Sequence, residues 1–161
     1  MVYHRDMTKE VKNLGELRAL AEKLLRGLAE REPSASSGRA TVVGLSGDLG
    51  SGKTAFTKCL ASALGIADVV TSPTFILEKV YIIPRGSLVG ERFTKLIHID
   101  AYRLHSASEM RALDWDALLA DEHNLILLEW PEQVKEVLPK DIMMLSFEYV
   151  DEGVRRVGGI E

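Results

Sequence analysis

A loop of eight residues, Gly47 to Thr54, carries the residue types needed to bind a phosphate group. It reads GDLGSGKT and fits the pattern G-x-x-x-x-G-K-[ST]. Glycines in such a loop let successive backbone N–H groups turn towards phosphate oxygens, and the N-terminus of the following helix adds partial positive charge. Lys53 would neutralise the β- and γ-phosphates, and the Thr54 hydroxyl would be a ligand of Mg²⁺. We therefore predict a bound nucleotide, held by Asp48, Leu49, Gly50, Ser51, Gly52, Lys53, Thr54 and Ala55.

Two acidic residues follow β-like runs and could complete this site. Asp100 follows the run KLIHI, and Glu129 follows NLILL. Ligands bind at the carboxyl edge of parallel sheets, so both acids are expected to face the phosphates, to serve the Mg²⁺ site and to position an attacking water. The alternative is that each acid only ends a strand in water. We predict Asp100 and Glu129 as catalytic residues and, with Thr54, as metal ligands; which acid binds the metal directly is left open.

The residues around Asp100 each have two interpretations. Alternation along a strand puts His98, Asp100 and Tyr102 on one face, with Arg103 just beyond. His98 could be an outer partner of the acidic group or could be a buried histidine with a structural role. Arg103 could stabilise phosphate charge or pair with a nearby acid.

Ser72–Phe75 and Trp130 also have two interpretations each. Ser72–Phe75 (SPTF) lies where some nucleotide switches carry a threonine that senses the γ-phosphate, but it also fits an ordinary proline-containing turn. Trp130 could stack on a base or a partner, or could pack in the core or at its rim.

The elements that must position these residues alternate between strands and helices. Ala40–Ser46 is predicted as a short buried strand that enters the loop, and Lys53–Leu64 as the helix that leaves it. Gly65 is the expected C-cap of that helix. Its apolar face consists of Phe56, Cys59, Leu60, Ala63 and Leu64.

The rest of the chain supplies further strands and helices. Leucines at helical spacing from Leu14 to Leu28 predict a first helix with Asn13 as its N-cap, and Ser106-x-x-Glu109 predicts another helix that runs towards Leu119. The other predicted elements are two extended runs, Phe75–Ile83 and Arg92–Asp100, joined by a turn at Pro84–Gly90; a buried strand, Asn124–Glu129; a short helix from Pro131 to Pro139; and a hairpin of Ile142–Val150 with Val154–Val157. We expect an α/β fold, a P-loop NTPase-like sandwich with a largely parallel central sheet flanked by helices and with β-hairpin elements, forming a single nucleotide-binding domain over residues 1–161.

The composition agrees with such a domain. The chain has 161 residues, 27% of them charged and 46% hydrophobic, as in globular proteins that bury a core. A net charge of −4 argues against strong non-specific binding to a nucleic-acid backbone. The single cysteine, Cys59, cannot form an internal disulfide, and neither a signal-peptide pattern nor a membrane-length apolar run is present. We expect a cytoplasmic protein with no membrane partner.

Four motifs together resemble the TsaE (YjeE) family of bacterial ATPases. They are GDLGSGKT, SPTF, HIDAYRL (His98–Leu104) and LEWPE (Leu128–Glu132), in the order and at roughly the spacing of that family. The resemblance covers most of the chain, from Thr8 to about Pro139. It implies a small P-loop protein that binds ATP with Mg²⁺, hydrolyses it slowly to ADP, and is required for threonylcarbamoyl-adenosine modification (t6A) of tRNA at adenosine 37.

The same resemblance implies partners and residue roles. The partners would be TsaD and TsaB, with tRNA contacted indirectly through their complex. Lys53 and Thr54 would hold phosphates and metal, Asp100 and Glu129 would serve Mg²⁺ and the attacking water, and Thr74 in SPTF would join the nucleotide-binding residues near the γ-phosphate. The adenine pocket is unspecified, with residues 8–15 as a candidate region. One departure is Asp114, which stands where family members often have a glycine.

Two other classes of protein use the same loop. A small-molecule kinase would need an acceptor pocket and usually an arginine-rich lid, whereas the arginines here are scattered. A GTPase switch would need an N-K-x-D guanine reader and a D-x-x-G motif, and the sequence contains neither. The kinase is the main alternative to the ATPase.

Overall fold

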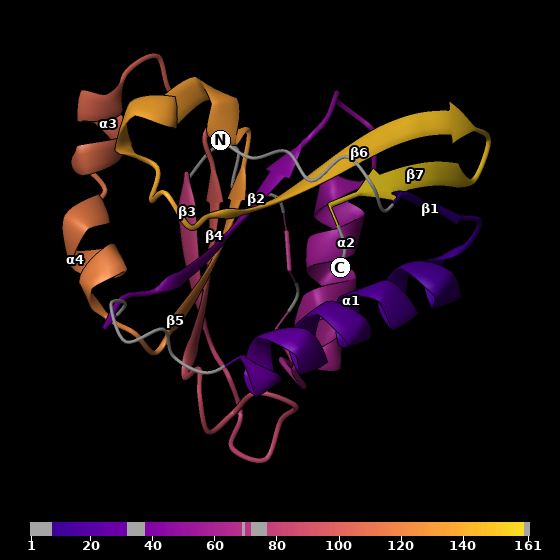
Figure 1. Cartoon of the computed structure of the whole chain (residues 1–161), viewed down its shortest axis with the longest axis horizontal. Coiled ribbons are helices and arrows are strands. Elements are labelled where there is room, and N and C mark those ends of the chain that lie inside the picture. Colours follow the sequence, from indigo (N-terminus) through magenta and orange to yellow (C-terminus); the bar gives the residue numbers. More distant parts are fainter. Residues whose placement is uncertain (1–7, 32–37, 69, 72–76, 160–161) are drawn as a thin grey trace.

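The computed structural model describes residues 8–31, 38–68, 70–71 and 77–159, which form one mixed sheet with helices on both faces (Figure 1). The strands are β1 (Thr8–Val11), β2 (Thr41–Ser46), β3 (Glu78–Ile82), β4 (Lys95–Asp100), β5 (Asn124–Glu129), β6 (Met143–Asp151) and β7 (Val154–Gly158). The helices are α1 (Leu14–Glu30), α2 (Lys53–Ala63), α3 (Ala107–Arg111), α4 (Trp115–Ala120) and the 3-10 helix η1 (Pro131–Val137).

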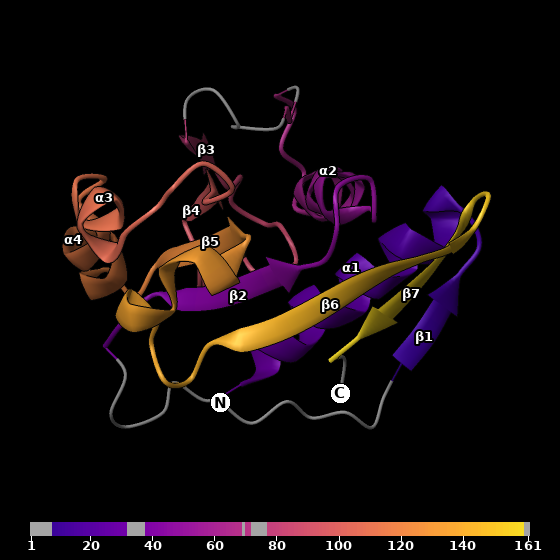
Figure 2. The same ribbon diagram turned by 90° about the horizontal axis from the view of Figure 1, so that it is seen from above.

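The sheet has the order β1-β7-β6-β2-β5-β4-β3. Its centre is parallel, because β2 pairs in parallel with both β5 and β6, and β5 pairs in parallel with β4. Antiparallel pairs flank this centre: β3 with β4 on one side, and β6 with β7 and β1 on the other (Figure 2). The predicted α/β fold with a largely parallel central sheet and β-hairpins is confirmed.

Side-chain alternation along the central strands divides the core between the two faces of the sheet. One face packs on α1 and α2, and the other packs on α3, α4 and η1 (Figure 1). Strand β5 is buried along its whole length because it contributes to both cores. The face towards α1 and α2 carries Val43, Leu45, Leu96, Leu125 and Leu127, and the opposite face carries Val42, Ile97, Ile99, Ile126 and Leu128.

The first helix has the predicted N-cap. The Asn13 side-chain oxygen accepts a 2.9 Å hydrogen bond from the backbone N–H of Glu16, and the Glu16 carboxylate accepts one from the backbone N–H of Lys12. The leucine stripe from Leu17 to Leu28 is buried as expected. Leu14 is the exception, because its side chain is 68% exposed.

The prediction of one helix from Ser106 towards Leu119 is wrong. Ser106 caps α3 as predicted, but the chain leaves the helix at Arg111 and starts α4 at Trp115. Asp114 between them has φ 55° and ψ 35°, the left-handed conformation that glycine adopts most easily. The break lets Trp115 bury its ring and donate from Nε1 to the Val137 carbonyl at 2.9 Å.

Other differences concern the ends of elements. Strand β4 begins at Lys95, because Arg92 and Phe93 donate backbone hydrogen bonds to the Val89 carbonyl in the turn before it. On α2, Cys59 and Ala63 are half-buried, whereas Thr57 and Ala61 are buried. Strand β1 was not predicted; it is four residues long and pairs with β7. In the described part of the chain, no helix has the length and apolar character needed to span a bilayer.

The conformation of Asp114 can be tested by comparing two substitutions. Asp114→Gly should unfold at a higher temperature than Asp114→Ala, by the equivalent of about 1 kcal/mol, because alanine is strained at positive φ and glycine is not. Burial and the nearby Asp114 carboxylate raise the pKa of Glu78. Both variants remove that carboxylate, so the difference in stability between them isolates the effect of the backbone conformation. Equal stability in urea or thermal unfolding would contradict the assigned conformation.

Candidate functional site

The predicted phosphate loop joins β2 to α2 in a confined backbone path. Gly47 has φ 147°, and a Cβ atom there would overlap the backbone carbonyl of Phe147 in β6. Gly50, at the tip of the loop, has φ 76° but nothing within 4 Å of the corresponding position. The loop is therefore held against the sheet at its start and is open to solvent at its tip.

Lys53, the first residue of α2, points back into this loop. Its side chain is 5% exposed and donates to the carbonyls of Gly47 and Asp48, the second at 2.9 Å. Burial lowers the pKa of its ammonium group, and attraction to nearby carboxylates opposes that change. The carboxylates belong to Glu129, Glu132, Asp100 and Asp48.

Glu129 ends β5 directly beside the start of α2. It is 3% exposed, and its Oε1 accepts a hydrogen bond from the Thr54 hydroxyl at 3.3 Å. The same oxygen lies 2.8 Å from Nε2 of His98, which is completely buried on β4. Glu129 therefore connects the phosphate loop to the neighbouring strand.

Asp100 lies next to Glu129, because the two residues are partners in the β4–β5 register. It is 4% exposed, and its Oδ1 accepts a 2.9 Å hydrogen bond from the backbone N–H of Tyr102. The sheet thus brings both predicted acids to the edge that carries Lys53 and Thr54.

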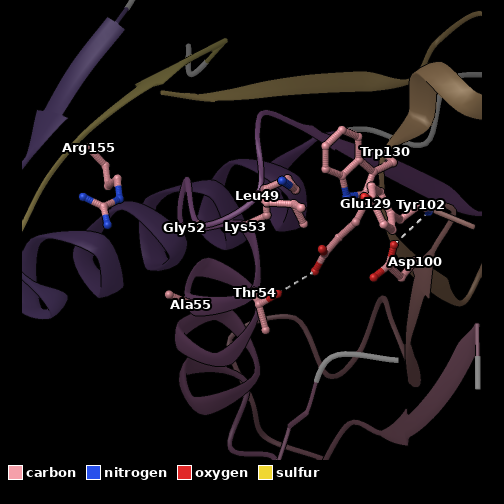
Figure 3. A pocket seen from close by; sticks show the side chains of 11 residues that line it. Leu49, Gly52, Lys53, Thr54, Ala55, Asp100, Tyr102, Glu129, Trp130 and Arg155 are labelled. Atoms are coloured by element: carbon pink, nitrogen blue, oxygen red, sulfur yellow. Dashed lines mark hydrogen bonds between the residues drawn. The ribbon is translucent and has the colours of Figure 1, made fainter. Parts of the chain in front are cut away.

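A cavity of about 390 Å³ lies over this edge (Figure 3). Most of the predicted nucleotide-binding residues line it, but Asp48 and Ser51 do not. The Asp48 carbonyl accepts a hydrogen bond from Lys53, and Ser51 is buried, with 1% of its surface exposed. Arg103 and His98 are also not lining residues, and Thr74 lies outside the described residues, as does all of SPTF. The lining residues are Leu49, Gly50, Gly52, Lys53, Thr54, Ala55, Asp100, Tyr102, Glu129, Trp130 and Arg155.

Trp130 packs at the rim of the core, as one of its two interpretations predicts, and it also lies beside the phosphate loop. It is half-buried against the core, yet its ring lies 4.4 Å from Lys53 Nζ and 5.0 Å from the ring of Tyr102, centre to centre. Its backbone has φ 57°, an uncommon conformation for a non-glycine residue and one that the following Pro131 also disfavours. Such strain is typical of functional positions, and here it turns the indole over the phosphate loop.

Arg155 is a lining residue that sequence reasoning missed. It lies on β7, on the far side of Gly52 from Glu129 (Figure 3). Its guanidinium donates to the carbonyls of Asp151 and Val154 and packs 4.5 Å from the ring centre of Tyr149. The predicted hairpin contained this arginine, but only the strand order shows that it reaches the loop.

A second cavity, of about 240 Å³, adjoins the first and shares Gly52, Ala55 and Arg155 with it. Its other walls come from the β1–α1 corner and from Phe147 of β6. These walls include part of the region from residue 8 to 15 that the sequence suggested for adenine. The lining residues specific to this cavity are Val11, Lys12, Asn13, Leu14, Leu17, Phe147 and Gly153.

The donor set at the sheet edge fits a hard divalent cation. Thr54, Asp100 and Glu129 all offer oxygen, which Mg²⁺ prefers, and Mg²⁺ usually takes only one or two carboxylates beside phosphates and water. Within the described ranges, no group of three or more His, Cys, Asp or Glu side chains could hold a metal by itself. These three residues could hold Mg²⁺ together with the phosphates of a nucleotide.

A strand, β2, that enters a GxxxxGKT loop and a helix, with one acid at the end of the neighbouring strand β5 and another at the end of the next strand β4, defines a P-loop protein. The match is specific enough to assign a family within that class. The family model described as "Threonylcarbamoyl adenosine biosynthesis protein TsaE" matches residues 11–157. The chain belongs to the TsaE family.

Individual relatives agree with this assignment. The tRNA threonylcarbamoyladenosine biosynthesis protein TsaE of Streptomyces coelicolor is 40% identical over 66% of this chain and 68% of its own length. The protein of the same name from Borreliella burgdorferi is 39% identical over 68% of this chain and 74% of its own length. The crystal structure of Bacillus subtilis YdiB, at 24% identity, superposes with a TM-score of 0.70 over 100% of this chain and 89% of that one, so the fold is shared.

The confinement of the loop predicts a difference between two glycines. The free energy of unfolding should be lower for Gly47→Ala than for Gly50→Ala by about 2 kcal/mol or more. Both substitutions incur backbone strain, but only the first forces a Cβ atom into the backbone of β6. Urea unfolding of the two variants measures this difference. Similar stabilities would mean that the loop is not held against β6 as described.

Proposed function

We propose that this protein is a slow, Mg²⁺-dependent ATPase that is required for threonylcarbamoylation of adenosine 37 in tRNA. The observation that carries the proposal is the convergence of Lys53, Thr54, Asp100 and Glu129 at one sheet edge in a member of the TsaE family. The relatives named above are biosynthesis proteins for this modified nucleoside.

The larger cavity is suited to the phosphates. Lys53 donates hydrogen bonds to the carbonyls of Gly47 and Asp48, and a bound phosphate would give its buried charge a stronger partner than these neutral groups. The free N–H groups at the start of α2 would add donors at the same place. Binding would therefore draw Lys53 from the loop carbonyls onto the phosphates.

Glu129 is the residue best placed to act on water. The hydrogen bonds of Glu129 with Thr54 and with His98 both use Oε1, so Oε2 is the oxygen that would accept a proton from, or orient, an attacking water. Bound Mg²⁺ would supply charge stabilisation at the phosphates, and Thr54 with Asp100 would hold it or its waters. In this assignment Asp100 and Glu129 have different tasks.

The smaller cavity is suited to the adenine base. It continues from the phosphate cavity past Ala55 and Arg155, and the side chains of Val11, Leu17 and Phe147 give it apolar walls for a flat ring. Arg155 lies between the two cavities, where it would meet the ribose or the α-phosphate. ATP is the favoured nucleotide because the sequence has no N-K-x-D guanine reader.

The resemblance to the family suggests how ATP turnover is used. We infer that the protein acts with TsaD and TsaB, that it reaches tRNA only through their complex, and that hydrolysis resets this complex between rounds of modification. Its intrinsic rate would then be low and would respond to the partners. Such a role places it in the cytoplasm.

Removing the lysine should abolish nucleotide binding. Lys53→Ala is expected to weaken ATP binding by about a hundredfold or more, because the phosphate charge loses its buried partner. Titration calorimetry with ATP and Mg²⁺ measures the affinity. Lys58→Ala, an exposed lysine of the same helix, is the matched control and should bind within about twofold of the original protein. Near-normal binding by Lys53→Ala would refute the phosphate site.

The same pair of variants tests the biological role. With TsaB, TsaD and the other components of the modification reaction, the protein and Lys58→Ala should support repeated rounds of t6A formation, whereas Lys53→Ala should not. Mass spectrometry of tRNA nucleosides measures the product. Equal t6A yields with Lys53→Ala would separate nucleotide binding from the role in tRNA modification.

Replacing the carboxylate of Glu129 should affect hydrolysis far more than binding. Glu129→Gln keeps an oxygen for Thr54 and His98 but removes the base, so phosphate release should fall by about a hundredfold while ATP affinity stays within about threefold. Glu136→Gln, at an exposed position on η1, serves as the control. Equal losses of binding and hydrolysis would make Glu129 a metal ligand or a folding residue instead.

A further inference from the structure

His98 is a buried polar residue whose position the proposed phosphate chemistry has not explained. Its side chain has no exposed surface, and it lies on the face of β4 that is directed towards α1 and α2. Burying an imidazole in a core is unfavourable unless it forms hydrogen bonds. A leucine would fill such a position at lower cost, so the contacts of His98 need a reason.

The contact of His98 with Glu129 supplies that reason. Nε2 lies 2.8 Å from Oε1, and because an ionised carboxylate only accepts hydrogen bonds, Nε2 must be the donor. The two side chains come from adjacent parallel strands and are 0% and 4% exposed, so the bond is shielded from water. A hydrogen bond to a charged acceptor in such surroundings is short and strong.

This bond also determines which carboxylate oxygen is engaged. The Thr54 hydroxyl donates to the same Oε1 at 3.3 Å, so two donors from two different elements hold one oxygen of Glu129. Neither contact uses Oε2. A carboxylate fixed in this way cannot rotate freely about its last torsion, and Oε2 keeps a constant direction relative to the loop.

We propose that His98 is a positioning residue that orients Glu129 for ATP hydrolysis. It acts through Glu129 and lies outside the lining of the phosphate cavity. If Thr54 were to direct its hydroxyl to a bound Mg²⁺, His98 would be the partner that still holds Oε1. The proposal rests on the proposed function, since it assigns His98 a part in the same reaction.

Three substitutions distinguish positioning from simple core packing. Leucine removes the donor and keeps the volume roughly constant; glutamine places an amide N–H at a reach similar to Nε2; asparagine has the amide but is too short. We expect His98→Leu to lower kcat about tenfold or more with the ATP Kd within about threefold, and His98→Gln to recover most of kcat while His98→Asn does not. A purely structural role would lower kcat and binding together, in proportion to the loss of folded protein.

A double-variant cycle tests whether the effect passes through Glu129. In a Glu129→Gln background, His98→Leu should change the remaining kcat by less than about twofold, because the group that His98 orients has lost its function. A full additional tenfold loss would overturn the proposal. If His98→Leu does not fold, equal kcat values for His98→Gln and His98→Asn would overturn it as well.

A structural readout separates this proposal from the proposed function. The crystal structure of His98→Leu, or of His98→Asn if the leucine variant does not fold, should show the Glu129 carboxylate in a new rotamer with its Oε1 contact to Thr54 lost. An unchanged carboxylate would overturn the positioning role, whatever the activity. If the unaltered protein does not hydrolyse ATP, the proposed function fails, and the position of Glu129 still decides whether His98 orients it.

Discussion

The burial of the Glu129 carboxylate is the constraint on which the site depends. Glu129 ends a strand whose six residues are all buried, and an ionised carboxylate there is costly unless it is hydrogen-bonded and compensated. Compensation comes from two elements: β4 supplies His98, and the start of α2 supplies the Thr54 hydroxyl and the charge of Lys53. The strand order β2-β5-β4 is what brings these elements around one residue.

The same arrangement keeps the loop ready for an anion. Lys53 is buried beneath Trp130 and donates hydrogen bonds to two loop carbonyls, so its hydrogen-bond partners among the residues that the structure describes are neutral. A phosphate would replace those carbonyls with a negatively charged partner, which would offset the effect of burial that lowers the pKa of Lys53. The strained backbone of Trp130 holds its indole ring over the ammonium group of Lys53. The buried charge of Lys53 and the strained backbone of Trp130 both lower the stability of the folded protein, a cost that is common at functional sites. Binding of an anion would offset the part that comes from Lys53.

Sequence reasoning captured what local patterns determine. The apolar run before Glu129, the cap at Asn13 and the glycine loop each depend on neighbouring residues, and each was predicted at nearly its observed position. The break at Asp114 was missed because the capping signal at Ser106 continues into good helix formers, and only the burial of Trp115 favours a second helix. Arg155 was missed because its place beside Gly52 depends on the pairing of β7 with β6 and of β6 with β2, and β2 lies about a hundred residues earlier in the chain.

We propose that one nucleotide occupies both cavities, with its phosphates at Lys53 and its base at the β1–α1 corner. A crystal structure with Mg²⁺ and a non-hydrolysable ATP analogue tests it most directly. We expect Lys53 to leave the Gly47 and Asp48 carbonyls for the phosphates, the adenine to pack against Val11, Leu17 and Phe147, and His98 to keep its hydrogen bond with Glu129. An analogue bound away from the loop, or with its base outside the smaller cavity and Lys53 unmoved, would contradict it.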